Sequence, residues 1–218
     1  MMMRRRSLLA GLAAAAAVPA IAWPRFPAFA ALTRTMRRVR PSDPAWPGAA
    51  SWQKLKDAVG GNLVEVQSLF GDCPAEPNGP SCVDAKKNVR NPFYLGDQAG
   101  GTQVSGWLDA WTPAPSAYAI EARSAADVQT AVDFARVHHL RLAVKGTGHD
   151  YLGRSSAADS LLVWTHGMRG ITVHDAFVAD GCDPATAVPA MTVEAGARWL
   201  EATAPRPSTT ATSRVAAA

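Results

Sequence analysis

The chain has 218 residues, room for one or two small domains with a core, and its 48% hydrophobic and 18% charged content is that of a globular protein. Its formal charge of +4 does not indicate a polyanionic partner, because the first 30 residues contain Arg4, Arg5, Arg6 and Arg25 and no acid. The remaining chain has 18 basic and 18 acidic residues, so its net charge gives no reason to expect nucleic-acid binding.

Residues 1–30 have the pattern of a signal peptide. Arg4–Arg6 form a basic start, Leu8–Ile21 is an apolar, Ala-rich run, and Ala28–Ala30 is a small-x-small cleavage pattern. The run is short for a membrane span, and an uncleaved anchor is the alternative. Arg5–Arg6 followed by Ser7 and two leucines also matches the twin-arginine export signal, with an ordinary Arg-rich secretory signal as the alternative. We therefore expect an exported protein, periplasmic or extracellular, without membrane attachment after cleavage.

Residues 31–114 are expected to form an extended arm and a loop-rich region. Residues 31–50 are basic and Pro-rich. The apolar pattern of residues 52–69 predicts a short helix that ends at a Gly-Gly pair, followed by a strand. From Gly71 to Pro115 the composition is typical of loops, with Trp107 and Trp111 as packing anchors.

Two of the three cysteines lie close together in this loop-rich region. Cys73 and Cys82 stand among Pro, Gly, Asn and Asp residues. In an oxidising compartment they predict a disulfide that stabilises the fold by about 2–3 kcal/mol. A two-ligand metal site is the alternative, but it lacks partners at metal-ligand spacing, so we expect no metal. Cys182 is left as a free or buried thiol, with no feature of a nucleophile.

From residue 117 the sequence predicts a strand–helix–strand unit. Residues 117–122 have strand character, and Ser124 with Asp127 forms a capping box that starts a helix. One face of this helix carries apolar residues at helical spacing, namely Val128, Ala131, Val132 and Ala135. The helix is expected to end near His138–His139, before an apolar strand at 140–144. Such short crossovers favour parallel pairing.

Shorter elements follow in the last third of the chain. Residues 161–164, 171–173 and 191–194 are expected to be strands. Ala195–Gly196 ends the last strand, and a helix starts at Arg198. The expected fold class is therefore α+β with short strands.

The loop at residues 145–156 carries the candidate chemistry. It contains three glycines, a threonine and two serines, so its amides are accessible and can form a concave anion site. Lys145 and Arg154 add positive charge, which suits a pyrophosphate; a purely structural turn is the alternative. The spacing fits neither the dinucleotide-binding fingerprint nor a P-loop. His149, in the middle of the loop, is by itself compatible with a solvent-facing histidine.

Residues from about Pro115 to Leu200 resemble the amino-terminal half of the PCMH-type FAD-binding domain of the vanillyl-alcohol-oxidase superfamily. The berberine-bridge-enzyme-like oxidases are the most similar subgroup. The family motif of a basic residue, two further residues, Gly and His is filled by Lys145, Gly148 and His149. The resemblance also rests on the runs 122–126, 142–155, 161–165 with Met168, and 193–199.

The resemblance implies that FAD is the cofactor and that a ring nitrogen of His149 bonds covalently to the 8α-methyl group of the flavin. The other cofactor-binding residues that it implies are Lys145, Gly146, Thr147, Gly148, Asp150, Gly153, Arg154, Ser155 and Gly196. Intact members oxidise a small alcohol or sugar by hydride transfer to the flavin, with oxygen as acceptor. The family's second Gly-rich segment with its cysteine, and its substrate domain, are not found here, so no catalytic acid or base is named.

The chain therefore divides into a signal peptide at 1–30, the arm and loop region at 31–114, a partial FAD-binding domain at 115–201 and a tail at 202–218. The tail lacks apolar periodicity, and Pro205 and Pro207 stop the helix. We expect it to be disordered and out of frame, which predicts a truncated and inactive chain. The alternatives are a secreted non-enzymatic domain, in which the Gly-rich loop is only structural, and a pseudogene product.

Overall fold

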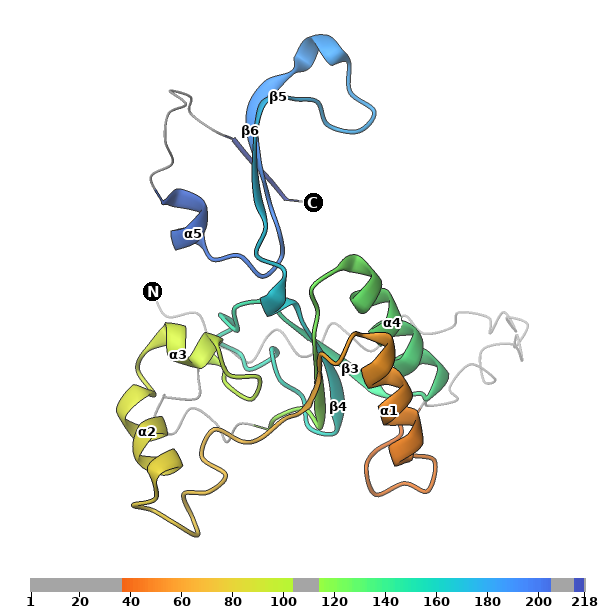
Figure 1. Ribbon diagram of the computed structural model, residues 1–218, viewed down its shortest axis with the longest axis vertical. Coiled ribbons are helices and arrows are strands. Elements are labelled where there is room, and N and C mark those ends of the chain that lie inside the picture. The colour runs from red at the N-terminus through yellow and green to blue at the C-terminus, as the bar shows by residue number, and fades with distance from the viewer. Residues whose placement is uncertain (1–36, 104–113, 205–213, 218) are drawn as a thin grey trace, which may run out of the picture. The chain divides into compact units, whose positions relative to one another are not determined.

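The computed structural model describes residues 37–103, 114–204 and 214–217 (Figure 1). The predicted signal peptide and the two tryptophans Trp107 and Trp111 lie outside these ranges. The described helices and strands lie in the compact unit Arg38–Ala218. The α-helices are α1 (Ala49–Ala58), α2 (Pro80–Asn88), α3 (Pro92–Gly96), α4 (Ala125–Val137) and α5 (Trp199–Thr203). The strands are β1 (Leu63–Glu65), β2 (Tyr118–Glu121), β3 (Arg141–Lys145), β4 (Ser160–Trp164), β5 (Ile171–Phe177), β6 (Val188–Val193) and β7 (Arg214–Ala217), which confirms the α+β class.

The strand–helix–strand unit is present as β2, α4 and β3. Both strands are parallel to β4, which lies between them in a sheet of order β1-β2-β4-β3. The capping box is confirmed: the hydroxyl of Ser124 accepts from the amide of Asp127 at 3.2 Å, and the Asp127 carboxylate accepts from the amide of Ser124 at 3.1 Å. The helix ends at Val137, next to the predicted His138. The local sequence therefore determines β2, α4 and β3, and pairing with β4 joins the two strands into one sheet.

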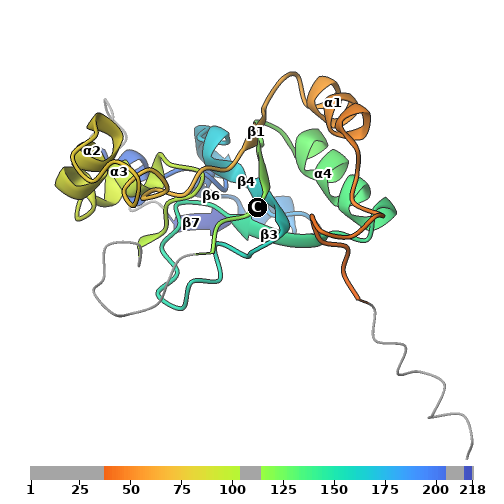
Figure 2. The ribbon, with the colours of Figure 1, turned by 90° about the horizontal axis from the view of Figure 1, so that it is seen from below.

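The sheet has two buried faces because successive side chains of a strand point to opposite sides. On one face Leu161, Val163 and Ile120 pack against α1 and α4, the two helices that lie together in Figure 2. On the other face Leu162 and Trp164 pack with smaller residues, including Ala119 and Ala143. All five residues of β4 are buried, as expected of a central parallel strand. This sheet is the framework on which the loop after β3 is held.

The region before residue 115 is more regular than predicted. The helix and strand expected at 52–69 are confirmed as α1 and β1, but the loop expected at 71–115 contains α2 and α3. Each of these short helices starts with a proline, a residue suited to the first helical position. The Asn91 side chain caps α3 by accepting from the amides of Phe93 and Tyr94. Neither helix has a clear apolar periodicity, so the sequence pattern missed both.

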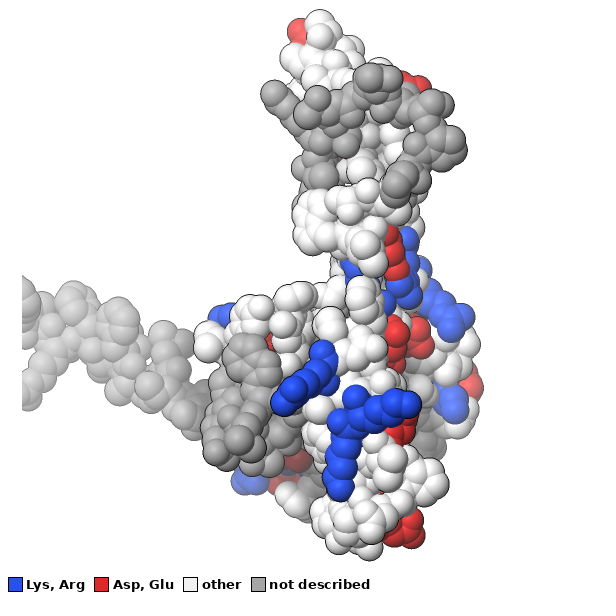
Figure 3. All heavy atoms as spheres, turned by 90° about the vertical axis from the view of Figure 1, so that its left-hand side faces the viewer, with Lys and Arg blue, Asp and Glu red and all other residues white. Residues whose placement is uncertain are grey.

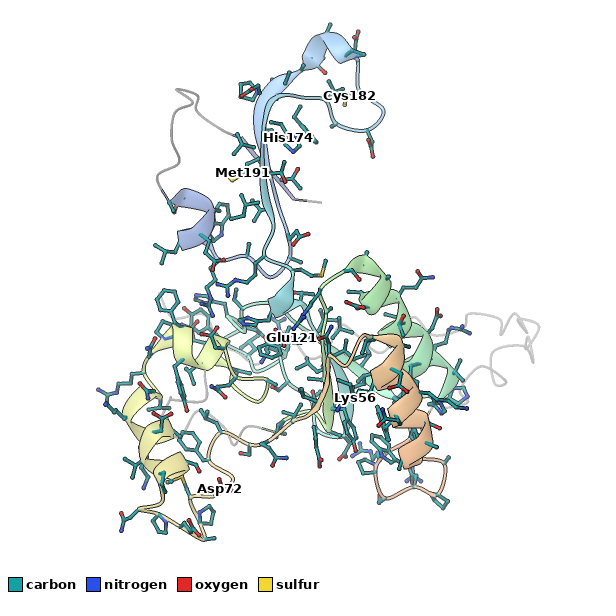
Figure 4. All side chains as sticks on the ribbon, in the orientation of Figure 1. Lys56, Asp72, Glu121, His174, Cys182 and Met191 are labelled. Carbon is teal, nitrogen blue, oxygen red and sulfur yellow. A yellow bond between two sulfur atoms is a disulfide. The ribbon has the colours of Figure 1, made fainter. Side chains whose placement is uncertain are left out.

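The predicted disulfide is confirmed: Cys73 and Cys82 are bonded, with their Cα atoms 5.0 Å apart. Cys82 is buried within α2, so the bond ties the start of that helix to the preceding loop. Cys182 is an exposed free thiol in the connection between β5 and β6, where Figure 4 labels it.

The second sheet has the order β5-β6-β7. Strands β5 and β6 are antiparallel, and β7 pairs with β6 in parallel. The sequence predicts a disordered tail at 202–218, but two parts of it have regular backbone structure. These are the last residues of α5 and strand β7. The physical reason is that a free strand edge can pair with extended backbone of almost any sequence.

The described surface shows no marked charge segregation on the face drawn in Figure 3, where basic and acidic side chains lie next to one another. Among the described residues, no helix combines the length and the hydropathy that a membrane crossing requires. The same residues contain no group of three or more His, Cys, Asp or Glu side chains arranged to hold a metal ion.

Candidate functional site

A pocket of about 530 Å³ opens at the carboxyl end of β3. Three segments that are distant in the sequence form it: α3 with Gln103, the loop after β3, and the stretch from Ala195 to the start of α5. Its lining residues are Pro92, Phe93, Leu95, Gln103, Gly146, Thr147, Gly148, His149, Ser155, Ala195, Ala197, Arg198, Trp199 and Leu200. Ligands of open α/β sheets bind at this end of the strands.

Four consecutive residues of the loop that follows β3, Gly146 to His149, line this pocket. Gly148 has a φ of +75°, a conformation that glycine adopts without strain. A Cβ atom at Gly146 would lie 3.0 Å from the carbonyl oxygen of Ala195, so the two walls of the pocket are close there. Within the described part of the chain, the amides of residues 146–149 donate no main-chain hydrogen bond. Consecutive amide donors without a protein acceptor favour an anionic ligand.

Five of the ten predicted cofactor-binding residues line the pocket: Gly146, Thr147, Gly148, His149 and Ser155. His149 is exposed, and its ring makes a T-shaped contact with that of Tyr151 at a centroid distance of 6.0 Å. The histidine is therefore placed where a ligand in the pocket could reach it. The other five, Lys145, Asp150, Gly153, Arg154 and Gly196, are not among the lining residues.

Asp150 and Arg154 are paired with each other. Their side chains form an ion pair of 2.9 Å, and the Asp150 carboxylate also accepts from the amides of Leu152 and Arg154. The hydrogen bond from Arg154 lowers the pKa of Asp150 to about 2. Gly153 completes this turn with a φ of +73°. These three residues shape the loop, and the charge of Arg154 is used within it.

Lys145 is not among the residues that line the pocket. Its side chain is 1% exposed, and its Nζ donates to the carbonyl oxygens of Gln98, Ala99 and Gly101 at 2.7–3.1 Å. Burial lowers the pKa of this amino group to about 7. The structure thus shows the amino group of Lys145 bonded to main-chain carbonyls of residues 98–101, and its role beside a ligand stays a prediction.

Gly196 acts by allowing close packing of the backbone. A Cβ atom at this position would lie 1.9 Å from the carbonyl oxygen of Thr165 and 2.8 Å from that of Met168. The Gly196 amide donates to Met168 O at 2.8 Å, and the Thr165 hydroxyl donates to Ala195 O at 3.1 Å. These contacts hold Ala195 and Ala197 in the pocket wall.

Sequence reasoning missed a polar cluster at the pocket. Arg198 donates to the carboxylate of Asp97 at 2.5 Å, and its guanidinium lies 5.1 Å from the ring centroid of Phe93. The Nε2 atom of His166 is 3.4 Å from the same carboxylate, and its ring stacks on Trp164. Burial is the main cause that lowers the pKa of His166. A basic residue inside an otherwise apolar run was the only sequence signal for Arg198, and Asp97 had none.

Comparisons with known proteins identify flavoproteins that are similar to this chain. The family model "FAD binding domain" matches residues 115–205. The FAD-linked oxidoreductase ZEB1 of Gibberella zeae is 34% identical over 157 residues, which are 62% of this chain and 26% of that protein. The VAO-type flavoprotein oxidase VAO615 of Thermothelomyces thermophilus is 29% identical over 189 residues, which are 79% of this chain and 32% of that protein.

A solved structure also matches this fold. The VAO-type flavoprotein MtVAO615 from Myceliophthora thermophila superposes with a TM-score of 0.62 at 27% sequence identity, covering 77% of this chain and 33% of that one. The chain thus spans about a quarter to a third of the length of these relatives.

Proposed function

We propose that the pocket after β3 binds FAD and that His149 holds it covalently. The premise is that residues 115–205 belong to the FAD-binding domain family of the FAD-linked oxidoreductases, which include VAO-type flavoproteins. One observation carries the proposal: an exposed histidine lies in a pocket beside consecutive amide donors that have no main-chain acceptor among the described residues. A dinucleotide with a pyrophosphate satisfies both features.

The residues of this chain fit that cofactor. The amides of residues 146–149 and the hydroxyl of Ser155 would hold the pyrophosphate. Neutral main-chain N–H donors can bind an anion without the burial of a positively charged side chain. A ring nitrogen of His149 would bond to the 8α-methyl carbon of the flavin as one C–H and one N–H bond break. The two electrons and two protons released would reduce the flavin ring, which oxygen would reoxidise with formation of hydrogen peroxide. Phe93, Trp199 and Leu200 line the pocket with apolar side chains, which an aromatic ring system would cover.

Bound FAD would supply the redox chemistry, accepting a hydride from a small alcohol or sugar and passing the electrons to oxygen. The part of the protein is to position the cofactor and to keep water out. Among the pocket residues, none is assigned as the acid or base that acts on the substrate.

Acid precipitation tests the covalent link. We expect wild-type protein expressed with FAD to give a yellow pellet, because covalent flavin stays with the polypeptide. His149→Ala should release its flavin into the acid supernatant, whereas His174→Ala, on β5, should retain it like wild type. Wild-type protein that binds FAD but loses it in acid would overturn the covalent link. A chain that binds no FAD would overturn the proposed function and favour the non-enzymatic alternative.

We also propose that the protein is exported. The disulfide between Cys73 and Cys82 supports this, because such bonds persist in oxidising compartments. Amino-terminal sequencing of protein recovered outside the cytoplasm should give Ala31 as the first residue. Recovery only in the cytoplasm, with the first 30 residues retained and both cysteines reduced, would contradict it.

A further inference from the structure

Lys145 has a side chain that the proposed FAD site does not use. It is the last residue of β3 and pairs in register with Trp164 of β4. The alternation of the strand turns it to the same face of the sheet as Ala143, away from α4. Its side chain is 1% exposed, so an ionisable group lies almost fully buried directly before the Gly-rich loop.

The surroundings of Lys145 match its hydrogen-bonding capacity. An ammonium has three N–H donors, and the Nζ atom meets three acceptors: Gln98 O at 2.8 Å, Ala99 O at 2.7 Å and Gly101 O at 3.1 Å. The face of the Trp164 ring lies 4.7 Å from Nζ. Among the described residues no carboxylate forms an ion pair with Lys145. The three main-chain carbonyls therefore offset the free-energy cost of burying the amino group, and the amino group holds these carbonyls in one arrangement.

The segment bound by Lys145 contacts the loop that carries His149. The amide of Gln103 donates to the carbonyl oxygen of Gly148 at 3.0 Å. A Cβ atom at Gly148 would lie 3.5 Å from Cδ of Lys145 and 3.6 Å from Gly101 O. The turn at Gly148 therefore packs against both Lys145 and the segment 98–103. Gln103 also lines the pocket. A continuous chain of contacts thus runs from Lys145 through residues 98–103 to Gly148, next to His149.

We propose that Lys145 is a positioning residue, whose amino group folds residues 98–103 against the turn at Gly148 and so fixes the place of His149 in the pocket. The proposal rests on the proposed function, in which His149 is the flavin anchor. It predicts that loss of the Lys145 hydrogen bonds slows covalent attachment of the flavin more than it weakens FAD binding, because the amides of residues 146–149 remain.

The test compares Lys145→Met, which keeps the length of the side chain without its donors, with Lys56→Met, a change of an exposed lysine on α1 that Figure 4 labels. The dissociation constant of FAD is measured by flavin fluorescence, and the rate of acid-stable incorporation by precipitation. We expect Lys145→Met to slow incorporation about 10- to 100-fold, the usual effect of displacing a reacting group, with little change in the dissociation constant. Lys56→Met should match wild type in both.

Hydrogen exchange provides a second measurement that does not depend on the flavin. In Lys145→Met the amides of Gly101 and Gln103, which donate to Gln98 O and Gly148 O, should exchange faster, while those of β2 and α4 keep their protection. Gln103→Pro removes the N–H that binds Gly148 O and should slow incorporation in the same way, even where Lys145→Met does not fold.

The outcomes separate the two proposals. Unchanged incorporation in Lys145→Met and Gln103→Pro, or equal losses of affinity, incorporation and global protection, would overturn the positioning role. A third outcome is that Lys145→Met selectively loses protection at Gly101 and Gln103 while the wild-type protein never retains flavin. It would support the contacts proposed here and overturn the proposed function of His149.

Discussion

Around the pocket, three charged side chains are bound to protein groups. Arg198 is paired with Asp97, Arg154 with Asp150, and Lys145 with main-chain carbonyls. The available donors are therefore the neutral amides of residues 146–149, which do not titrate. Such a site can bind a pyrophosphate through main-chain donors.

The first prediction concerns His166, which stacks on Trp164. Because burial lowers its pKa in the folded state, the unfolded chain takes up a proton first as the pH falls through the ordinary value of about 6.5. The folded state then loses stability towards acid. Wild type should lose unfolding free energy between pH 7 and pH 5 relative to His166→Phe, which keeps an aromatic ring but cannot titrate. The charged groups facing His166 are Asp97, Glu121, Arg169 and Arg198.

Urea unfolding of both proteins across this pH range checks the prediction. A difference in unfolding free energy that stays constant would show that the attraction of the neighbouring carboxylates offsets burial, and one that moves in favour of wild type in acid would show that it outweighs burial; either would contradict the prediction.

The second prediction concerns Gly196. In Gly196→Ala the new Cβ atom would meet the carbonyl oxygens of Thr165 and Met168 at 1.9 and 2.8 Å, and backbone atoms cannot turn away as a side chain can. We expect the free energy of unfolding to fall by about 1–3 kcal/mol or more, the usual cost of overpacking. Gly48→Ala is the matched control, since nothing lies within 4 Å of its Cβ position. Equal stability of the two variants in urea would contradict the close approach.

At the level of elements, the start of α4 is defined by its own sequence. Ser124 and Asp127 exchange hydrogen bonds at the first turn, and the Asp127 carboxylate also accepts from the amide of Arg123 at 2.9 Å. The helix packs on the face of the sheet that holds Leu161 and Val163. Because β3 and the loop with His149 follow this helix, its position decides where the loop begins.

The third prediction is that Ser124→Ala lowers the free energy of unfolding by about 0.5–2 kcal/mol, because one amide of the first turn loses its acceptor. The control is Ser81→Ala on α2, where the serine is exposed and, among the described residues, its side chain makes no hydrogen bond. Thermal or urea unfolding measures both. A cost for Ser81→Ala as large as that for Ser124→Ala would argue against the capping role.

On the scale of the whole molecule, large apolar side chains around the pocket are in contact with water. Phe93, Trp199 and Leu200 are 45%, 67% and 65% exposed, and all three line the pocket. Leu152, in the Gly-rich loop, is 66% exposed. Exposed apolar residues gathered in one place favour association with another surface.

The fourth prediction is that the chain self-associates through this area. Replacing Trp199 and Leu200 together by Ser should shift light-scattering mass towards the monomer, whereas Val137→Ser, a change at a 62% exposed valine on α4, should not. An unchanged mass distribution in the double variant would show that these residues do not contribute to association.

The sequence by itself determined the elements whose signals are local. The capping box of α4, the apolar run of β4, the Cys73–Cys82 pair and the Gly-rich loop with His149 could all be identified from neighbouring residues. Each depends on interactions within a few residues, or on a covalent bond between cysteines close in the chain, so the pattern of residue types is sufficient.

Only the tertiary structure decided how the charged residues of the site are used. Arg198 and Asp97 are 101 residues apart, and Lys145 is 44 residues or more from the carbonyls that it binds. The sequence shows that Lys145 precedes a Gly-rich loop, but the side of the strand that it faces depends on which segments pack there. Main-chain carbonyls carry no sequence signature, because every residue has one, and the partners of Lys145 therefore become visible only when the chain is folded.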